Sequence, residues 1–276
     1  MKITFLGTGT SHGVPPIDCM MRGYKDCPKG VCRKAQDDPR YNRTRTSVLF
    51  EKDGKTLIAD VSADFRQQAL RHDIRQIDAV ALSHGHIDHF GGLPDIRSYT
   101  ETAPLHIYAS AETLETVQRA FPYMFELRSA YSNMPAQTNP LQTVHGGVPK
   151  LIMTELTGTR DIAGFTVTPI PVTHGDLKQC LGLRIDNVGY VPDMKYMPPE
   201  SEEALKGLDC LILNCLREER EHRTHMLLRE SMSIARRLTP KRCYFIHMTH
   251  DIDFQTDSGK LDPWMQFSYD GLVINV

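Results

Sequence analysis

Four side chains that commonly bind transition metals lie within six residues of this sequence. His84, His86, Asp88 and His89 come directly after the apolar run Ala79–Leu82. Residues two apart in an extended segment point to the same side, so His84 and His86 can share a pocket, and a turn would bring Asp88 and His89 back over it. Three imidazoles and one carboxylate suit zinc, manganese or iron better than calcium or magnesium. The alternative is a polar surface loop that binds no metal.

Three cysteines form a second group, in a polar segment with several glycines and prolines. Seven residues separate Cys19 from Cys27, and four separate Cys27 from Cys32. Three thiolates and one imidazole would make a closed tetrahedral zinc site of the structural kind. The alternative is three reduced, unpaired thiols. The remaining cysteines lie in or beside apolar runs and are interpreted as core residues: Cys180, Cys210, Cys215 and Cys243.

The bulk composition is that of a globular protein with a sizeable core. Of the 276 residues, 40% are hydrophobic and 24% are charged, and the formal net charge is -2, which gives no strong field toward nucleic acid or an anionic membrane. No apolar run approaches the roughly 20 residues that span a bilayer, and the N-terminus is typical of a first strand rather than a signal peptide. We therefore expect a cytoplasmic protein whose seven cysteines are reduced.

Short β-branched runs alternate with helical segments along the chain, which indicates a layered α/β architecture. We expect one domain over residues 1–276, with the cysteine loop at 19–46 inside it and a surface loop at Arg128–Lys150. The predicted strands are Lys2–Leu6, Ser47–Phe50, Thr56–Ala59, Ala79–Leu82, Leu105–Tyr108, Phe165–Pro169, Leu181–Ile185, Val188–Val191, Cys210–Leu213, Cys243–Ile246 and Leu272–Asn275. The predicted helices are Ala63–Arg71, Ala111–Arg119 and Leu227–Leu238.

The pattern His-X-His-X-Asp-His after a strand resembles the signature of the metallo-β-lactamase superfamily. Within it, the chain most resembles the phosphoribosyl cyclic phosphate phosphodiesterases, and the resemblance runs nearly from end to end. The matching segments are 7–15, the three cysteines with Asp38-Pro39, Arg223-Thr224-His225, 245–251 and Tyr269-Asp270-Gly271. The fold that this resemblance implies is a four-layer αββα sandwich.

The resemblance also implies a site for two metal ions. His174 would join His84 and His86 on one ion, His247 would join Asp88 and His89 on the other, and Asp193 would be shared by both. Taken alone, His174 is equally consistent with a loop histidine that binds no metal, and Asp193 is equally consistent with a turn residue. The family often has a small hydroxyl residue before the shared aspartate, where this chain has Pro192.

In the related phosphodiesterases the cysteine site is completed by a histidine that corresponds to His250. Relative to them, Met20–Asp26 is an insertion. His225 matches their general acid and, with Asp88, is the predicted catalytic residue, because Asp88 helps to hold the metal that generates the nucleophile. His222 is a rival acid, a helix-cap role is the alternative for His225, and the role of His12 stays open.

The residues and the resemblance together predict a hydrolase that uses two divalent ions, Zn or Mn, at the active site and one structural Zn. Two ions roughly 3.5–4 Å apart can activate water and neutralise phosphate oxygens. The expected substrate is a small or cyclic phosphodiester. The alternatives are tRNA 3′-end processing, thioester or lactone hydrolysis, and a binding protein without catalysis. Basic residues at Arg33–Arg45 and Arg217–Arg237 alternate with acidic ones and are interpreted as solvated faces, so nucleic acid is not an expected partner. A homodimer is left open.

Overall fold

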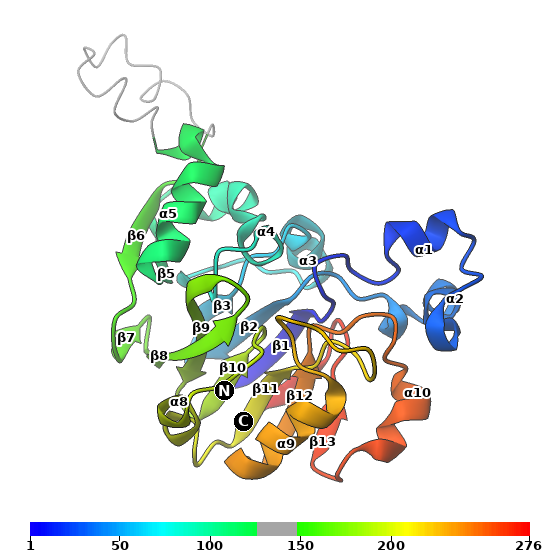
Figure 1. Ribbon diagram of the computed structural model, residues 1–276. Coiled ribbons are helices and arrows are strands. Elements are labelled where there is room, and N and C mark those ends of the chain that lie inside the picture. The colour runs from blue at the N-terminus through cyan, green and yellow to red at the C-terminus, as the bar shows by residue number, and fades with distance from the viewer. Residues whose placement is uncertain (126–147) are drawn as a thin grey trace, which may run out of the picture.

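Two sheets of seven strands face each other in the computed structural model, which describes residues 1–125 and 148–276 (Figure 1). The first sheet has the order β14 (Val273–Asn275), β1 (Lys2–Gly7), β2 (Ser47–Lys52), β3 (Lys55–Ala59), β4 (Ala79–Ala81), β5 (Leu105–Ala109) and β6 (Leu151–Glu155). The second has the order β13 (Met265–Phe267), β12 (Arg242–Ile246), β11 (Cys210–Asn214), β10 (Val188–Val191), β9 (Leu177–Ile185), β8 (Phe165–His174) and β7 (Arg160–Ile162).

Each sheet is mixed. Strands β3 to β6 run parallel, as do β10 to β13, whereas β1 to β3 and β7 to β10 pair antiparallel. Parallel neighbours end at the same edge of a sheet, so the loops that follow them meet there. Both sheets therefore present a row of loops in which polar side chains can gather.

Alternation along the strands places one apolar set between the sheets and another on their outer faces. In β2, Val48 and Phe50 belong to the core between the sheets, while Leu49 packs with the helices outside. In β3, Leu57 and Ala59 face inward and Ile58 faces outward. This two-residue period explains why both faces of these strands are apolar and buried.

Helices cover both outer faces, so the expected four-layer αββα arrangement is confirmed (Figure 1). The α-helices are α1 (Ile17–Met21), α2 (Val31–Asp37), α3 (Phe65–Arg71), α4 (Ile87–Phe90), α5 (Ala111–Ala120), α8 (Pro199–Ala204), α9 (Leu228–Leu238) and α10 (Phe254–Asp257). Short 3-10 turns lie at Pro28–Gly30, Pro39–Tyr41, Leu93–Thr100, Pro122–Met124 and Ser258–Lys260.

The predicted elements differ from the observed ones mainly at their ends. The helix expected from Ala63 begins at Phe65, and the one expected from Leu227 begins at Leu228, because Leu227 is extended and serves as the N-cap residue. Most of the predicted loop at Arg128–Lys150 lies outside the described residues. Within residues 1–125 and 148–276, the structure contains no helix that is both long and apolar enough to cross a membrane.

Candidate metal centre

The histidines and aspartates predicted as ligands follow the ends of strands from both sheets. His84, His86, Asp88 and His89 follow β4 of the first sheet, the last two inside the short helix α4. The others come from the second sheet. His174 is the last residue of β8, Asp193 lies two residues beyond β10, and His247 follows β12 directly. Each ligand is thus anchored by a strand or its adjoining turn, which holds the geometry of a site more firmly than a long loop would.

The Asp193 carboxylate lies between two groups of histidines. Its Oδ2 is 3.6 Å from His84 Nε2 and 3.4 Å from His174 Nε2. Its Oδ1 is 3.6 Å from His89 Nε2 and 3.0 Å from His247 Nδ1. One oxygen therefore faces each group, as a carboxylate shared by two ions would.

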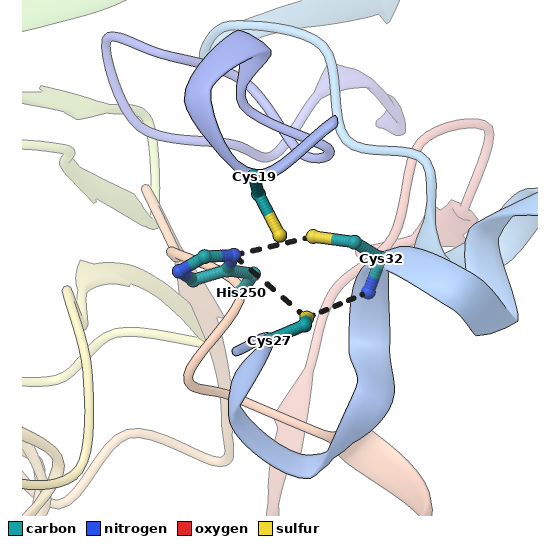
Figure 2. Close-up of side chains that lie close together, drawn as sticks. All are labelled: Cys19, Cys27, Cys32 and His250. Carbon is teal, nitrogen blue, oxygen red and sulfur yellow. Dashed lines mark hydrogen bonds between the residues drawn. The ribbon is translucent and has the colours of Figure 1, made fainter. Parts of the chain in front are cut away.

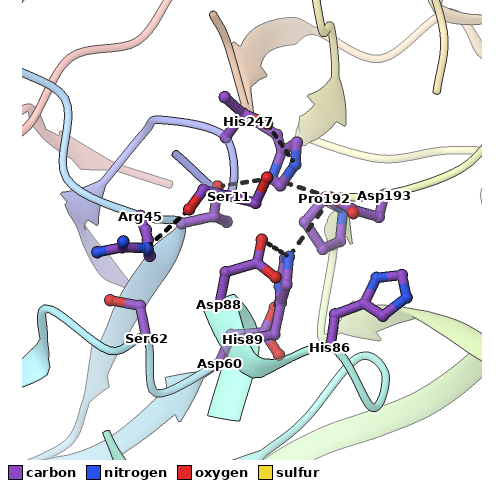
Figure 3. Close-up of polar contacts among 12 residues, drawn as sticks. Ser11, Arg45, Asp60, Ser62, His86, Asp88, His89, Pro192, Asp193 and His247 are labelled. Atoms are coloured by element: carbon purple, nitrogen blue, oxygen red, sulfur yellow. Dashed lines mark hydrogen bonds and ion pairs between the residues drawn. The ribbon is translucent and has the colours of Figure 1, made fainter. Parts of the chain in front are cut away.

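Ligand atoms converge in the two sets that the resemblance implies. His84, His86, His174 and Asp193 offer atoms within 4.8 Å of one another, and so do Asp88, His89 and His247. Figure 3 shows Asp88, His89, Asp193 and His247 directed toward one another. His86 is exposed, whereas the other members of the two sets are buried.

The donor atoms of the site are better placed to bind metal ions than to form hydrogen bonds with one another. His84 Nε2 lies 3.0 Å from His86 Nδ1, and His174 Nε2 lies 3.3 Å from that same His86 nitrogen. His89 Nε2 and Asp193 Oδ1 are buried and make no hydrogen bond of good geometry. Buried polar atoms without partners are costly, and a divalent ion would satisfy them. The residues present thus fit a binuclear site.

Hydrogen bonds from residues around the ligands fix the orientation of the His89 and His174 rings. Asp60, directly after β3, accepts hydrogen bonds from the Ser83 backbone N–H (2.8 Å), the Ser83 hydroxyl (2.8 Å), the Tyr190 hydroxyl (2.8 Å) and His89 Nδ1 (2.7 Å). His174 Nδ1 donates to the backbone carbonyl of Thr224 at 2.8 Å. With Nδ1 donating, the Nε2 lone pair of each ring is left for a ligand bond.

In this site, burial and the neighbouring charges shift the pKa of Asp193 in opposite directions. Burial alone would raise the pKa of Asp193, but the histidines around it, His247 and His89 first, hold it well below the usual range. Burial also lowers the pKa of His84, and neighbouring histidines lower it further. Asp193, Asp88 and Asp60 act in the other direction on His89 and, against the effect of burial, raise its pKa well above the usual value, so a metal ion bound there would displace a proton from His89.

His225 lies at the open side of this centre. Its Nδ1 is 3.8 Å from Asp193 Oδ2, and its ring centroid is 4.7 Å from that of His174 and 5.0 Å from that of His247. Burial, with help from the neighbouring histidines, lowers the pKa of His225 to about 2, although the Asp193 carboxylate opposes the shift. A phosphate anion beside the ring would favour its protonated form.

The three cysteines of the first loop meet His250 (Figure 2). Their sulfur atoms and a ring nitrogen of His250 lie within 4.8 Å of one another, and none of the three is in a disulfide. His250 Nδ1 is 3.2 Å from Cys32 Sγ and 3.9 Å from Cys27 Sγ, while the Cys32 backbone N–H donates to Cys27 Sγ at 3.1 Å. Three sulfurs and one nitrogen suit a tetrahedral structural zinc.

A buried arginine connects this loop to the ligand-bearing segment after β12. Arg43 is 1% exposed and donates to the backbone carbonyls of Thr249 (2.7 Å) and Ile252 (2.8 Å). The interpretation of Arg33–Arg45 as a solvated face is wrong for this residue, because its guanidinium satisfies backbone carbonyls inside the fold. The other cysteines, Cys180, Cys210, Cys215 and Cys243, are buried among the strands as expected.

Pro192, which replaces the small hydroxyl residue of the family pattern, still takes part in the support of the site. Its carbonyl accepts a hydrogen bond from Asn214 Nδ2 at 2.7 Å, and Asn214 Oδ1 accepts from the backbone N–H of Met226. Asn214 thus ties the segment before Asp193 to the segment after His225.

Sequence reasoning missed several supporting residues. Asp60 anchors His89 and Ser83, and Tyr190 donates its hydroxyl hydrogen bond to Asp60. Thr46 and Thr10 place hydroxyls 3.1 Å and 3.3 Å from the two nitrogens of the His247 ring. The one available signal was for Asp60, a carboxylate directly after a buried strand. Tyr190 carried none, because an aromatic residue in an apolar strand is an ordinary core residue.

A pocket of about 670 Å³ opens beside the metal centre. His225, His222, His12 and His250 all contribute to its lining, so it connects the open side of the metal centre to the cysteine loop. The predicted general acid, its rival and the histidine without an assigned role thus share one cavity. A pocket of this size accepts a small molecule.

Comparison with known proteins gives a family match and similar solved structures. Residues 55–248 match the family model described as the β-lactamase superfamily domain. The chain is similar to the solved structure of a diphosphatase of the PhnP family, with 33% identity, a TM-score of 0.83, and coverage of 100% of this chain and 97% of the other. It is also similar to Zn²⁺-bound PqqB from Methylobacterium extorquens, with a TM-score of 0.72, 20% identity and full coverage of both chains.

A curated relative from Porphyromonas gingivalis, named octanoyltransferase, is 33% identical over 276 residues. The alignment takes in 99% of this chain but 51% of the relative, so the chain spans about half the length of that protein.

Proposed function

Since this chain belongs to the β-lactamase superfamily of metal-dependent hydrolases, and within it to the PhnP family, we propose that it hydrolyses a small phosphodiester with two divalent ions. The observation that carries the proposal is the position of Asp193, with one carboxylate oxygen facing each group of histidines. The diphosphatase activity named for its PhnP-family relative supports phosphorus as the electrophile.

Bound ions would supply an activated water and would neutralise the phosphate oxygens. The chain's own residues hold those ions in two sets, bridged by Asp193. The first set is His84, His86 and His174, and the second is Asp88, His89 and His247. Asp60 and the Thr224 carbonyl keep the rings in the required tautomer. These supporting contacts pre-organise the site before substrate arrives.

His225 is placed to give a proton to the leaving oxygen. It is partly buried next to Asp193, on the side where the pocket opens. Burial holds the pKa of His225 low in the unliganded site, and an anionic substrate beside the ring would favour its protonated form. His222 lies further out, with its ring centroid 5.0 Å from that of His225, and is half-buried. We therefore assign the role of proton donor to His225 rather than to His222.

A small molecule suits the pocket better than an RNA does. The formal net charge is -2, and arginines of the pocket rim are partly neutralised by carboxylates, so few cations remain for a long phosphate backbone. We therefore propose a small-molecule partner. The expected active-site ions are Zn or Mn, with zinc at the cysteines.

The test is a substrate panel with metal-loaded enzyme. It compares bis(nitrophenyl) phosphate, a cyclic nucleotide, a pyrophosphate diester, a precursor tRNA and an octanoyl thioester, the last because of the Porphyromonas relative. We expect turnover of the small phosphorus esters, abolished in Asp193→Ala and retained in an exposed control, Tyr196→Phe. Turnover of the thioester alone, at full metal occupancy, would sink the proposal.

A further inference from the structure

The pocket beside the metal centre has two chemically different walls. Arg45, Arg217 and Arg220 bring guanidinium groups to it, together with the imidazole of His222. Ile17 and Met21 of α1 bring apolar side chains that are 73% and 77% exposed. A ligand that fills this space therefore meets cations on one side and an apolar surface on the other.

The three arginines differ in what neutralises them. Arg45 pairs with Asp64 at 3.0 Å, and Arg220 pairs with Asp251 at 2.6 Å. Among the residues that the structure describes, no carboxylate lies within 4.0 Å of the Arg217 guanidinium. Arg217 thus keeps a positive charge that the protein itself does not balance, at the side of the pocket that carries His222 and His225.

Arg217 is nevertheless held in place. Its Nε donates to the backbone carbonyl of Arg220 at 2.8 Å, and its Nη2 donates to that of Glu221 at 3.2 Å. The loop that it spans is closed at its base, where Leu216 N–H donates to the Met226 carbonyl and Leu228 N–H to the Arg217 carbonyl. A guanidinium has five N–H donors. Two are used in these contacts, so three remain for a ligand on a side chain that is already oriented.

His222 adds a donor on the same loop. Its Nδ1 accepts from the Thr224 backbone N–H at 3.4 Å, which leaves the ring proton on Nε2. The ring is 5.0 Å from that of His225, the proposed proton donor. Burial, followed by the charge of Arg217, lowers the pKa of His222, so it acts as a neutral N–H donor beside the cation.

We propose that Arg217 and His222 bind a second phosphate, and that the substrate is a pyrophosphate diester. This inference rests on the proposed phosphodiesterase function. Water adds to the phosphorus held at the metal centre, and the bond from that phosphorus to the bridging oxygen breaks. The bridging oxygen leaves with the electron pair as part of the second phosphate and takes a proton from His225. The products are two phosphate monoesters.

The apolar wall of the pocket favours a particular kind of substituent on the second phosphate. Ile17 and Met21 belong to the same short helix as Cys19, whose sulfur is held in the cysteine and histidine cluster. The helix that carries these exposed side chains is therefore anchored beside the pocket. A flat apolar group, such as a nucleobase, fits against them, which makes a nucleoside-containing diphosphate the expected class.

The first experiment compares Arg217→Met with Arg236→Met, a control whose guanidinium pairs with Asp262 outside the pocket lining. Each is assayed on a pyrophosphate diester and on the phosphodiester with the same two substituents. A charge-assisted contact to phosphate predicts that Arg217→Met lowers kcat/KM about 10- to 100-fold on the pyrophosphate alone. Arg236→Met, whose side chain lies outside the pocket lining, should change both substrates little. Equal losses on both substrates would mean that Arg217 only clamps the loop and would overturn the proposal.

Direct binding separates this inference from the proposed function. Calorimetry of the methylene-bridged, uncleavable analogue should show weaker binding to Arg217→Met than to wild type, even if wild type cleaves neither substrate. Unchanged binding would reject the phosphate site on its own. Met21→Ser should weaken binding of an adenosine-containing analogue more than that of a methyl-capped one, whereas Met20→Ser, outside the pocket lining, should not. Equal effects would reject the apolar wall.

Discussion

His89 Nδ1 lies 2.7 Å from Asp60 Oδ2, and both side chains are fully buried (Figure 3). A carboxylate that accepts from one ring nitrogen makes the other a better metal ligand and fixes its direction. Asp60 has a φ of +61°, a backbone conformation that few residues other than glycine, asparagine and aspartate adopt. The backbone is thus held in an uncommon state at the point where it supports the site.

Asp60→Asn should weaken metal binding while the fold stays intact, because asparagine tolerates the same backbone conformation. Loss of the charge behind His89 predicts a drop in metal affinity of about 10- to 100-fold. Metal titration of the purified variants measures it. Tyr190→Phe removes one hydrogen bond to the same carboxylate without removing its charge and should have a smaller effect. Equal affinity in Asp60→Asn and wild type would show that Asp60 serves the fold alone.

Metal removal should distinguish the two kinds of site. One active-site ligand, His86, is exposed, whereas Cys19 and Cys32 are buried, and three thiolates with one imidazole would form a closed tetrahedral site. Treatment with a chelator should therefore strip the active-site ions first and abolish activity, with zinc retained at the cysteines. Elemental analysis after dialysis checks this order. Protein without residual zinc but with an unchanged melting temperature would argue against a structural site.

Cys27→Ser should lower the melting temperature, since it opens a four-ligand site whose binding free energy contributes to folding. The wild-type melting temperature should fall when zinc is withdrawn, whereas that of the variant should hardly respond to zinc. Scanning calorimetry with and without added zinc gives the comparison. If both proteins respond alike, Cys27 is an ordinary thiol.

Zinc at the cysteines should be lost on acidification. Burial raises the pKa of the Cys19 thiol, and burial with the neighbouring thiols raises that of Cys32, so zinc must displace protons from both. Protons compete better as pH falls, and the apparent zinc affinity must decrease in that direction. A competition titration with a coloured chelator at a series of pH values measures the slope. An affinity independent of pH would mean that the thiols are not ligands.

His225→Ala should leave metal content and folding intact but lower turnover by roughly 10²–10⁴-fold on substrates with alkoxide leaving groups. A nitrophenolate leaves as a stable anion without a proton, so turnover of that ester should fall far less. The ratio of the two losses in one variant is the informative quantity. Asp88→Ala should instead lose metal and damage both reactions together. Equal losses in His225→Ala with metal retained would move the acid role to His222.

The sequence predicted the fold and the general location of the metal site because both depend on local patterns. Alternating apolar residues identified the strands, and closely spaced ligand-type residues after Ala79–Leu82 identified one edge of a sheet. His174, Asp193 and His247 stand alone in the sequence, and family resemblance was needed to relate them to that edge. The structure places them there because the second sheet packs its own strand ends against the first.

What escaped prediction are contacts between segments far apart in the chain. Asp60 and Tyr190 are separated by 130 positions, and Arg43 reaches Ile252 across 209. Arg217 was interpreted as part of a solvated face because acidic residues surround it in sequence. In the structure these carboxylates pair elsewhere, as Glu218 does with Lys29 and Glu221 with Arg229, and Arg217 is left uncompensated in the pocket. Which charges pair is decided by tertiary geometry, and sequence proximity does not specify it.

The two sets of ligands that share Asp193 come from both sheets, and this arrangement affects how the protein unfolds. The ligands after β4 belong to one half of the sandwich, and those after β8, β10 and β12 belong to the other. An ion bound by both halves acts as a cross-link, so its binding free energy resists their separation. Metal-loaded protein should then unfold as one cooperative unit, whereas the metal-free chain loses that tie and its two halves are freer to exchange amide hydrogens independently.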